Sequence, residues 1–247
     1  MCQVSWTKPL DFQISIASLK PIALCWLKNK RLWARPGMEE ESHVNGPRGG
    51  EAPTTPGLSV MEGQGAYNRH SHRQVAGGAL AVPLLERAAH AVDPGPDDRP
   101  LLIADYGSSQ GRNSLRPMRA AIAVLRERFG AERPICVTHT DLPDNDFSTL
   151  FQTLQANPDS YLRDQPNVFS SAVGLSFYES VLPPAQVSLG WSSFAAMWLS
   201  RIPAYIPGHF WDQRATGAVR EEFDAQAAID WRIFLSLRAR ELRPTTA

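Results

Sequence analysis

Residues 101–130 read LLIADYGSSQGRNSLRPMRAAIAVLRERFG, and this stretch decides the fold class. It begins with a short continuous apolar run that ends at Asp105, which is typical of a buried parallel strand. A turn that contains glycine follows. Apolar residues then recur at spacings of three and four, and Gly130 is a typical helix stop, so the pattern predicts a helix over 115–129.

A second strand signal follows this helix. The apolar run 135–137 leads to Asp141, and the spacing from Asp105 to Asp141 is about that of one βαβ unit. An α/β fold with a doubly wound parallel sheet is the economical interpretation. Ligands bind outside the carboxyl ends of such strands, where helix N-termini offer unpaired N–H groups. We therefore expect Asp105 and Asp141 to face one crevice.

The crevice residues favour a nucleoside ligand. A carboxylate at the end of the second strand can accept hydrogen bonds from both hydroxyls of a ribose. The turn GSSQGRNS, 107–114, contains neither GxGxxG nor the GK[ST] of a phosphate loop. This weakens dinucleotide and nucleoside triphosphate interpretations and leaves a nicotinamide-dependent oxidoreductase as the weaker alternative. S-adenosylmethionine, which has adenosine but no phosphate, fits better.

Composition narrows the class of protein. The chain has 247 residues, of which 43% are hydrophobic, enough for one domain with a sizeable core. It has 25 basic and 25 acidic residues, so it carries no charge pattern for nucleic acid or for an anionic membrane. Three cysteines without zinc-like spacing suit a reducing compartment. We expect a cytoplasmic protein with neither nucleic acid nor a membrane as partner.

Composition also changes along the chain. All four lysines lie in the first 30 residues, and the proline- and glycine-rich segment 36–59 is typical of a linker. We expect 1–60 to be an irregular extension outside the fold and 61–247 to form the domain. The apolar run 21–27 is too short to span a membrane.

Five stretches resemble a known family. They are MEGQGAYNRHSHRQ (61–74), IADYGSSQGRN (103–113), TDLPDNDFSTLF (140–151), SFYESVLPP (176–184) and WSSFAAMWLSRIP (191–203). In order and wording they resemble the signatures of the SABATH methyltransferases, which include salicylate, benzoate and jasmonate carboxyl methyltransferases and caffeine-pathway N-methyltransferases. The resemblance covers 61 to about 243 and suits a bacterial-type member. It implies a Rossmann-like class I methyltransferase sheet with flanking helices.

The resemblance also implies a site for S-adenosylmethionine. Its cofactor-binding positions correspond to Ser71, Asp105, Gly107, Asn113, Asp141, Leu142, Ser176 and Phe177. Among these, Asp141 would hold the ribose. Leu142 and Phe177 would sandwich the adenine, while Ser176 would supply a hydrogen bond.

An acceptor site is implied in the same way. Tyr67 and Gln74 belong to the N-terminal signature, which in the family folds over the cofactor and reaches the acceptor. Gln74 and Trp198 match the pair that grips the acceptor carboxylate, while Phe194 and Met197 match positions in the pocket wall. The spacing of Phe194, Met197 and Trp198 predicts that all three share one helical face, which would equally suit a core.

The implied reaction is methyl transfer to the carboxylate of a small organic acid, which forms a methyl ester. A carboxylic acid with a pKa of about 4 is ionised at neutral pH, so alignment suffices and no general base is required. A ring-nitrogen acceptor, as in the caffeine branch, would leave Gln74 without a carboxylate to grip. Without the resemblance, Asp105 would be a helix cap and Asp141 the start of a turn.

Some residues depart from the family pattern or have a simpler interpretation. Gln110 and Arg112 are bulkier than the residues of the usual DLGCSSGPN turn, so we expect them to narrow the cofactor mouth. We expect His70 and His72 to face solvent, because no ligand partner stands nearby. Cys136, inside an apolar run, is expected to be a buried small hydrophobe.

The end of the chain raises an alternative. In the family more than 100 further residues supply later strands, a helical cap and residues reported to bind magnesium, whose ligands are not identifiable here. We therefore expect an incomplete sheet with an unpaired edge near 187–190, and either marginal stability or association, for example as a homodimer. The alternative function is a truncated, catalytically silent protein that only binds cofactor or a partner.

Overall fold

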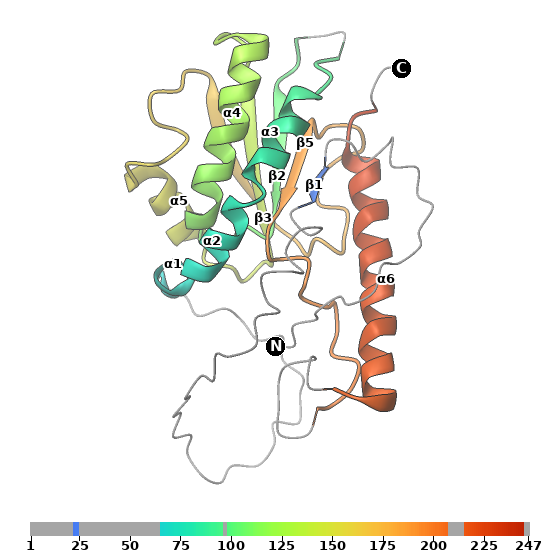
Figure 1. Ribbon diagram of the computed structural model, residues 1–247. Coiled ribbons are helices and arrows are strands. Elements are labelled where there is room, and N and C mark those ends of the chain that lie inside the picture. Colours follow the sequence, from blue (N-terminus) through green and yellow to red (C-terminus); the bar gives the residue numbers. More distant parts are fainter. Residues whose placement is uncertain (1–21, 25–64, 96–97, 207–214, 245–247) are drawn as a thin grey trace.

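The computed structural model describes residues 22–24, 65–95, 98–206 and 215–244, and its centre is a parallel sheet (Figure 1). The strands are β1 (Ile22–Leu24), β2 (Leu101–Tyr106), β3 (Ile135–Asp141), β4 (Val168–Gly174) and β5 (Leu189–Ser192). Their order is β1-β5-β2-β3-β4, and every pairing is parallel. The predicted parallel α/β sheet is confirmed.

Helices connect and flank these strands. They are α1 (Ala66–His70), α2 (His72–Ala79), α3 (Val82–His90), α4 (Leu115–Phe129), α5 (Phe147–Ala156) and α6 (Gly217–Glu241), and a short 3-10 turn spans Arg112–Ser114. The bounds of α4 match the prediction. Gly130 ends it with a φ of +79°, a conformation that glycine adopts without strain.

Strand β2 is buried on both faces. Leu101 and Ile103 belong to the core cluster formed with α3 and α4, whereas Ala104 and Tyr106 pack in a second cluster that includes Phe234 of α6. In Figure 1, α6 accordingly stands apart from α3 and α4, on the other side of the sheet. Burial on both faces explains why the strand reads as a continuous apolar run rather than an alternating one.

The strand order places the site. From β2 the chain moves outward through β3 and β4, and it then returns to place β5 on the opposite side of β2. In open parallel sheets such a reversal leaves a crevice at the carboxyl ends of the two strands, and ligands bind there. The loops that follow β2 and β5, together with the end of β3, are therefore the structural candidates for a binding site.

The predicted unpaired edge near 187–190 is wrong. β1 pairs with β5, and Ile22 lies opposite Gly190. Val187 forms two backbone hydrogen bonds with the segment at the end of α6. Its N–H donates to the Glu241 carbonyl and its carbonyl accepts from Arg243 N–H, both at 2.8 Å. A strand from the predicted extension and the segment after α6 cover this flank. The predicted boundary at residue 60 lies outside the described residues.

Three further predictions concern individual side chains. His70 and His72 are exposed, as expected. Cys136 is half-buried rather than buried, and the burial it has raises the pKa of its thiol. No helix in the described part of the chain is long and apolar enough to cross a membrane.

Candidate functional site

The loop after β2 lies against the end of β3. Gly107 and Ser108 both donate their N–H groups to the Thr140 carbonyl, at 2.8 and 3.1 Å. Gly107 has a φ of +82°, which glycine adopts readily and other residues rarely do. These bonds turn the chain sharply out of the sheet and bring residues 107–111 to the end of β3, where Asp141 lies.

The loop is fixed to Asp141 through backbone N–H groups. Asp141 Oδ2 accepts from Ser109 N–H at 2.6 Å, and Asp141 Oδ1 accepts from Leu142 N–H at 2.8 Å. Burial raises the pKa of this carboxyl, although the two N–H donors lower it in part. Asn145 donates to the Ser109 carbonyl at 2.9 Å and so braces Ser109, whose φ is +50°.

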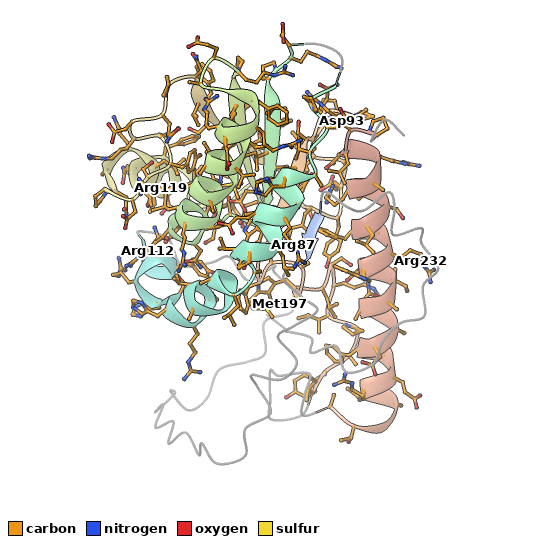
Figure 2. The ribbon with its side chains drawn as sticks, turned by 45° about the horizontal axis from the view of Figure 1, so that its top comes forward. Arg87, Asp93, Arg112, Arg119, Met197 and Arg232 are labelled. Carbon is orange, nitrogen blue, oxygen red and sulfur yellow. The ribbon has the colours of Figure 1, made fainter. Side chains whose placement is uncertain are left out.

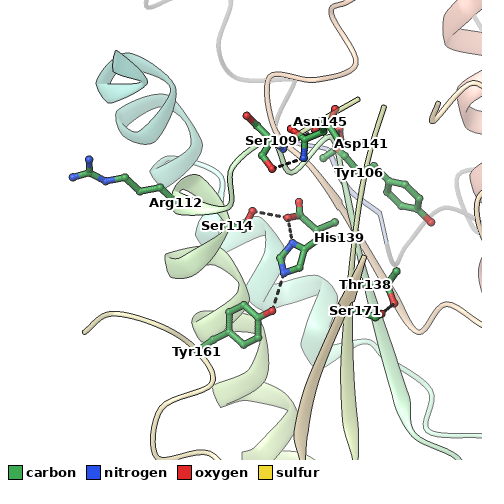
Figure 3. A network of polar contacts seen from close by, with 12 residues as sticks. Tyr106, Ser109, Arg112, Ser114, Thr138, His139, Asp141, Asn145, Tyr161 and Ser171 are labelled. Atoms are coloured by element: carbon green, nitrogen blue, oxygen red, sulfur yellow. Dashed lines mark hydrogen bonds and ion pairs between the residues drawn. The ribbon is translucent and has the colours of Figure 1, made fainter. Parts of the chain in front are cut away.

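Asp105 lies deeper, in a buried polar network. Its Oδ2 accepts from Ser114 Oγ at 2.5 Å and lies 2.9 Å from His139 Nδ1. On the other side of the ring, His139 Nε2 lies 2.7 Å from the Tyr161 hydroxyl (Figure 3). Asp105 and His139 are 3% and 0% exposed. The expectation that Asp105 faces an open crevice is therefore wrong, because the start of α4 and the interior of the sheet surround its carboxylate.

His139 and Tyr161 are functional-site neighbours that sequence reasoning missed. His139 stands within the strand that ends at Asp141, so its position was visible, but nothing local distinguished it from a core histidine. Tyr161 is 22 residues further along, after α5. Only the folded chain brings them together.

The N-terminal segment reaches the site through Asn113. Ser71 Oγ donates to Asn113 Oδ1 at 3.1 Å, and Asn113 Nδ2 donates to the Tyr67 hydroxyl at 3.3 Å. Burial raises the pKa of Tyr67, and the negative charges of Asp141 and Asp105 raise it further. Five residues predicted to bind the cofactor or the acceptor therefore lie close enough to interact. They come from three segments of the chain and are Tyr67 and Ser71, Asp105 and Asn113, and Asp141.

Asn68 of α1 holds this segment on the loop. Its N–H donates to Gln110 Oε1 at 3.2 Å, and its side-chain amide donates to the Gln110 carbonyl and to Thr153 Oγ1, both at 3.0 Å. Arg112 donates from its backbone to Asn68 Oδ1 and from its guanidinium to the Asn68 carbonyl. Gln110 and Arg112 were expected to narrow the cofactor mouth. Their contacts with Asn68 attach α1 to the turn after β2.

The loop after β5 packs on Gly107. A Cβ added at Gly107 would lie only 2.0 Å from Ala195 Cβ and 3.7 Å from Phe177 Cε1. Ser176, next to Phe177, accepts from Tyr178 N–H through its Oγ at 3.2 Å. Phe177 therefore stands beside the predicted cofactor loop, although β4, which precedes it in the chain, is separated from β2 by β3 in the sheet.

The acceptor residues are less closely joined. The shared helical face of Phe194, Met197 and Trp198 is wrong: the segment forms turns, and Phe194 has a φ of +60°, which an α-helix excludes. A Cβ at Gly77 of α2 would lie 2.4 Å from the Phe194 ring, so the lack of a side chain there admits the ring. Among the described residues, no hydrogen bond joins Gln74 to Trp198, and Figure 2 shows Met197 below α3.

Several polar atoms around the site have unused hydrogen-bonding capacity. Within the described ranges, the buried oxygens without a partner include Gln74 Oε1, Ser108 Oγ, Ser109 Oγ and Thr140 Oγ1. Buried polar groups are normally satisfied by protein, water or a ligand. Hydroxyls, an amide and the Asp141 carboxylate suit the hydroxyls of a ribose, and the carboxylate would repel a phosphate. The residues present thus fit S-adenosylmethionine.

Other kinds of site lie elsewhere or are not found. In the described part of the chain, no group of three or more His, Cys, Asp or Glu side chains is placed to hold a metal ion. A separate open cavity of about 380 Å³ is lined by Phe151, Leu154, Gln155, Leu162, Arg163 and Ser170. It includes none of the predicted site residues.

Comparisons with known proteins identify the family. Residues 57–246 match the family model of SAM-dependent carboxyl methyltransferases. Methyltransferase FUS9 of Gibberella moniliformis is 31% identical over 210 residues, which are 83% of this chain and 51% of the relative. A benzoic acid/salicylic acid carboxyl methyltransferase of Petunia hybrida is 30% identical over 193 residues, 73% of this chain and 54% of the relative.

A solved structure is similar to this fold. Loganic acid methyltransferase with SAH aligns with a TM-score of 0.60 and 23% sequence identity, over 74% of this chain and 54% of that one. The likeness shows that the fold is shared. The chain spans about half the length of the relatives that it matches.

Proposed function

Because the chain belongs to the family of SAM-dependent carboxyl methyltransferases, we propose that it binds S-adenosylmethionine and transfers the methyl group to the carboxylate of a small organic acid. The observation that carries the proposal is the chain of hydrogen bonds that joins Tyr67, Asn113 and Ser71 and brings them near Asp105 and Asp141. These residues come from three segments and meet where the strand order reverses.

In this proposal Asp141 accepts hydrogen bonds from the ribose, and Leu142 and Phe177 flank the adenine. Gly107 allows the loop after β5 to approach the cofactor loop, because any side chain there would collide with Ala195. S-adenosylmethionine supplies a methyl group activated by the positive sulfur. The chain's own residues orient the two reactants and exclude water.

No residue needs to remove a proton, since the acceptor acid is already ionised at neutral pH. His139 resembles a catalytic base because it contacts Asp105. However, both of its ring nitrogens are engaged, one with Asp105 and one with Tyr161, and the ring is fully buried. We assign it to the support of the site. The carboxylate of the acceptor is held by the Gln74 amide and the Trp198 indole N–H.

The first test is calorimetric titration with S-adenosylhomocysteine. A carboxylate that accepts hydrogen bonds from a ligand contributes about 1.5 to 3 kcal/mol, so Asp141→Ala should weaken binding roughly 10- to 150-fold. Asp144→Ala is the matched control, because this exposed carboxylate lies three residues away. Equal affinities of the wild type and Asp141→Ala would remove the proposal.

The second test separates an enzyme from a cofactor-binding protein. Transfer of labelled methyl from S-adenosylmethionine to a panel of aromatic and fatty acids should give a methyl ester with at least one acid. Gln74→Glu should suppress the transfer by placing a negative charge near the acceptor carboxylate. Binding of S-adenosylhomocysteine without transfer to any acid would favour the silent, binding-only alternative.

A further inference from the structure

A fully buried ion pair lies in the last turn of α6. Arg238 and Glu241 are each 1% exposed, and two parallel bonds of 2.9 Å join them, from Arg238 Nη2 to Glu241 Oε1 and from Nε to Oε2. Burying two charges is expensive unless their other donors and acceptors are also satisfied. The destination of those remaining bonds therefore indicates what the pair does.

Almost every remaining bond goes to one irregular segment, 177–182. Arg238 donates to the carbonyls of Phe177 and Glu179. Glu241 Oε1 accepts from the N–H groups of Val181 and Leu182 at 3.0 and 3.2 Å. This segment follows β4 and contains no helix or strand of its own. The ion pair therefore supplies it with the fixed partners that a helix or strand would otherwise provide.

The same pair also contacts the end of β2. The Tyr106 hydroxyl donates to Glu241 Oε2 at 2.8 Å, and the Arg238 guanidinium stacks on the Tyr106 ring, 4.4 Å from its centroid. Tyr106 stands between Asp105 and Gly107. The two charged side chains thus connect the start of the proposed cofactor loop to the segment that contains Phe177.

We propose that Arg238 and Glu241 are positioning residues that hold segment 177–182 in the geometry required for adenine binding. The inference rests on the proposed function, since Phe177 is an adenine contact there. Neither residue touches the reactants. They act through the Phe177 carbonyl on one side and the N–H groups of Val181 and Leu182 on the other, and so hold the backbone that carries the Phe177 ring, which packs edge-on against Phe234 of the same helix.

A merely structural role would give a different result. Loss of a structural pair lowers the free energy of unfolding but leaves the affinity of the remaining folded molecules unchanged. Loss of a positioning pair lowers that affinity. The loss of affinity should then also depend on Phe177, because a displaced ring can weaken binding only while the ring is present.

The experiment uses the full chain and three conservative variants. Arg238→Lys keeps the charge but cannot direct donors at two carbonyls and a carboxylate together. Glu241→Gln keeps the length and removes the charge. Asp224→Asn is the control, since Asp224 forms an exposed pair with Arg220 on the same helix. Circular dichroism confirms that each is folded, and calorimetry measures the affinity for S-adenosylhomocysteine.

We expect Arg238→Lys and Glu241→Gln each to weaken binding by about tenfold, the size expected when an aromatic contact with a base is displaced. Asp224→Asn should bind like the wild type. Combining Arg238→Lys with Phe177→Ala should weaken binding by less than the product of the two single effects. Glu241→Gln with Phe177→Ala repeats this test if Arg238→Lys does not fold.

Two results would overturn the inference while leaving the proposed function intact. One is wild-type affinity in folded Arg238→Lys and Glu241→Gln. The other is a full multiplication of the effects of Arg238→Lys and Phe177→Ala, which would show that the pair does not act through Phe177. If the wild-type chain itself did not bind S-adenosylhomocysteine, the proposed function would fail and this inference with it.

Discussion

Gly107→Ala should destabilise the protein by more than an ordinary glycine substitution. A left-handed conformation costs a residue with a side chain about 1 to 2 kcal/mol, and Gly107 has a φ of +82°. The new Cβ would also lie 2.0 Å from Ala195 Cβ, so the two loops must separate by about 1 Å to reach the usual minimum of 3.0 Å. Overpacking of this kind costs a further 1 to 3 kcal/mol or so, which gives about 2 to 5 kcal/mol in total.

Two further variants isolate the collision. Gly130 has a φ of +79° and a ψ of 174°, a conformation nearly confined to glycine, but nothing lies within 4 Å of an added Cβ, so Gly130→Ala should cost only the conformational part, about 1 to 3 kcal/mol. In Gly107→Ala combined with Ala195→Gly, the nearest Ala195 atom would be Cα at an ordinary 3.5 Å. Urea unfolding measures all three. No recovery of stability in the double variant would refute the close approach of the two loops.

Three other predictions concern the surroundings of the site. Because burial raises the pKa of Asp141 above its ordinary value of 3.8, the folded state binds this proton more tightly than the unfolded state, so stability is lost as pH rises from about 4 through the raised pKa. Urea unfolding at a series of pH values should show this loss of stability in the wild type and not in Asp141→Asn, and an equal pH dependence of the two proteins would contradict it. Tyr161→Phe leaves His139 Nε2 buried without its partner and should cost about 1 to 3 kcal/mol, whereas Tyr205→Phe, at a 79% exposed position, should cost nothing measurable. Asn68→Ala should speed hydrogen exchange in 65–79 relative to α4, and unchanged protection there would show that other contacts hold α1.

The central fold could be predicted because its signals are local. The apolar run before Asp105, the spacing of three and four after it and the stop at Gly130 all lie within 30 residues, and β2 and α4 follow them closely. The segment after β5 shows where this reasoning fails. Residues at positions 194, 197 and 198 have helical spacing, but a positive φ at Phe194 produces turns instead.

The site was predicted in part for the same reason. Gly107 and Asp141 were visible because each directly follows a strand signal. The supporting residues were not visible, since Tyr106 and Glu241 are 135 positions apart and meet only because α6 packs on the far face of β2. Neither the buried charge of Glu241 nor that of Arg238 has a local pattern that distinguishes it from a solvent-facing helix residue.

The contacts of Asn68 also bear on how this protein can change during evolution or engineering. Its amide and backbone meet a glutamine at 110, an arginine at 112 and a threonine at 153, so replacing Asn68 removes a bond from all three at once. Homologous sequences should therefore vary at 68, 110 and 112 together. A chimera that received only the glycine-rich turn of a plant relative would inherit a mismatched first helix, and transplanting both pieces as a unit should restore it.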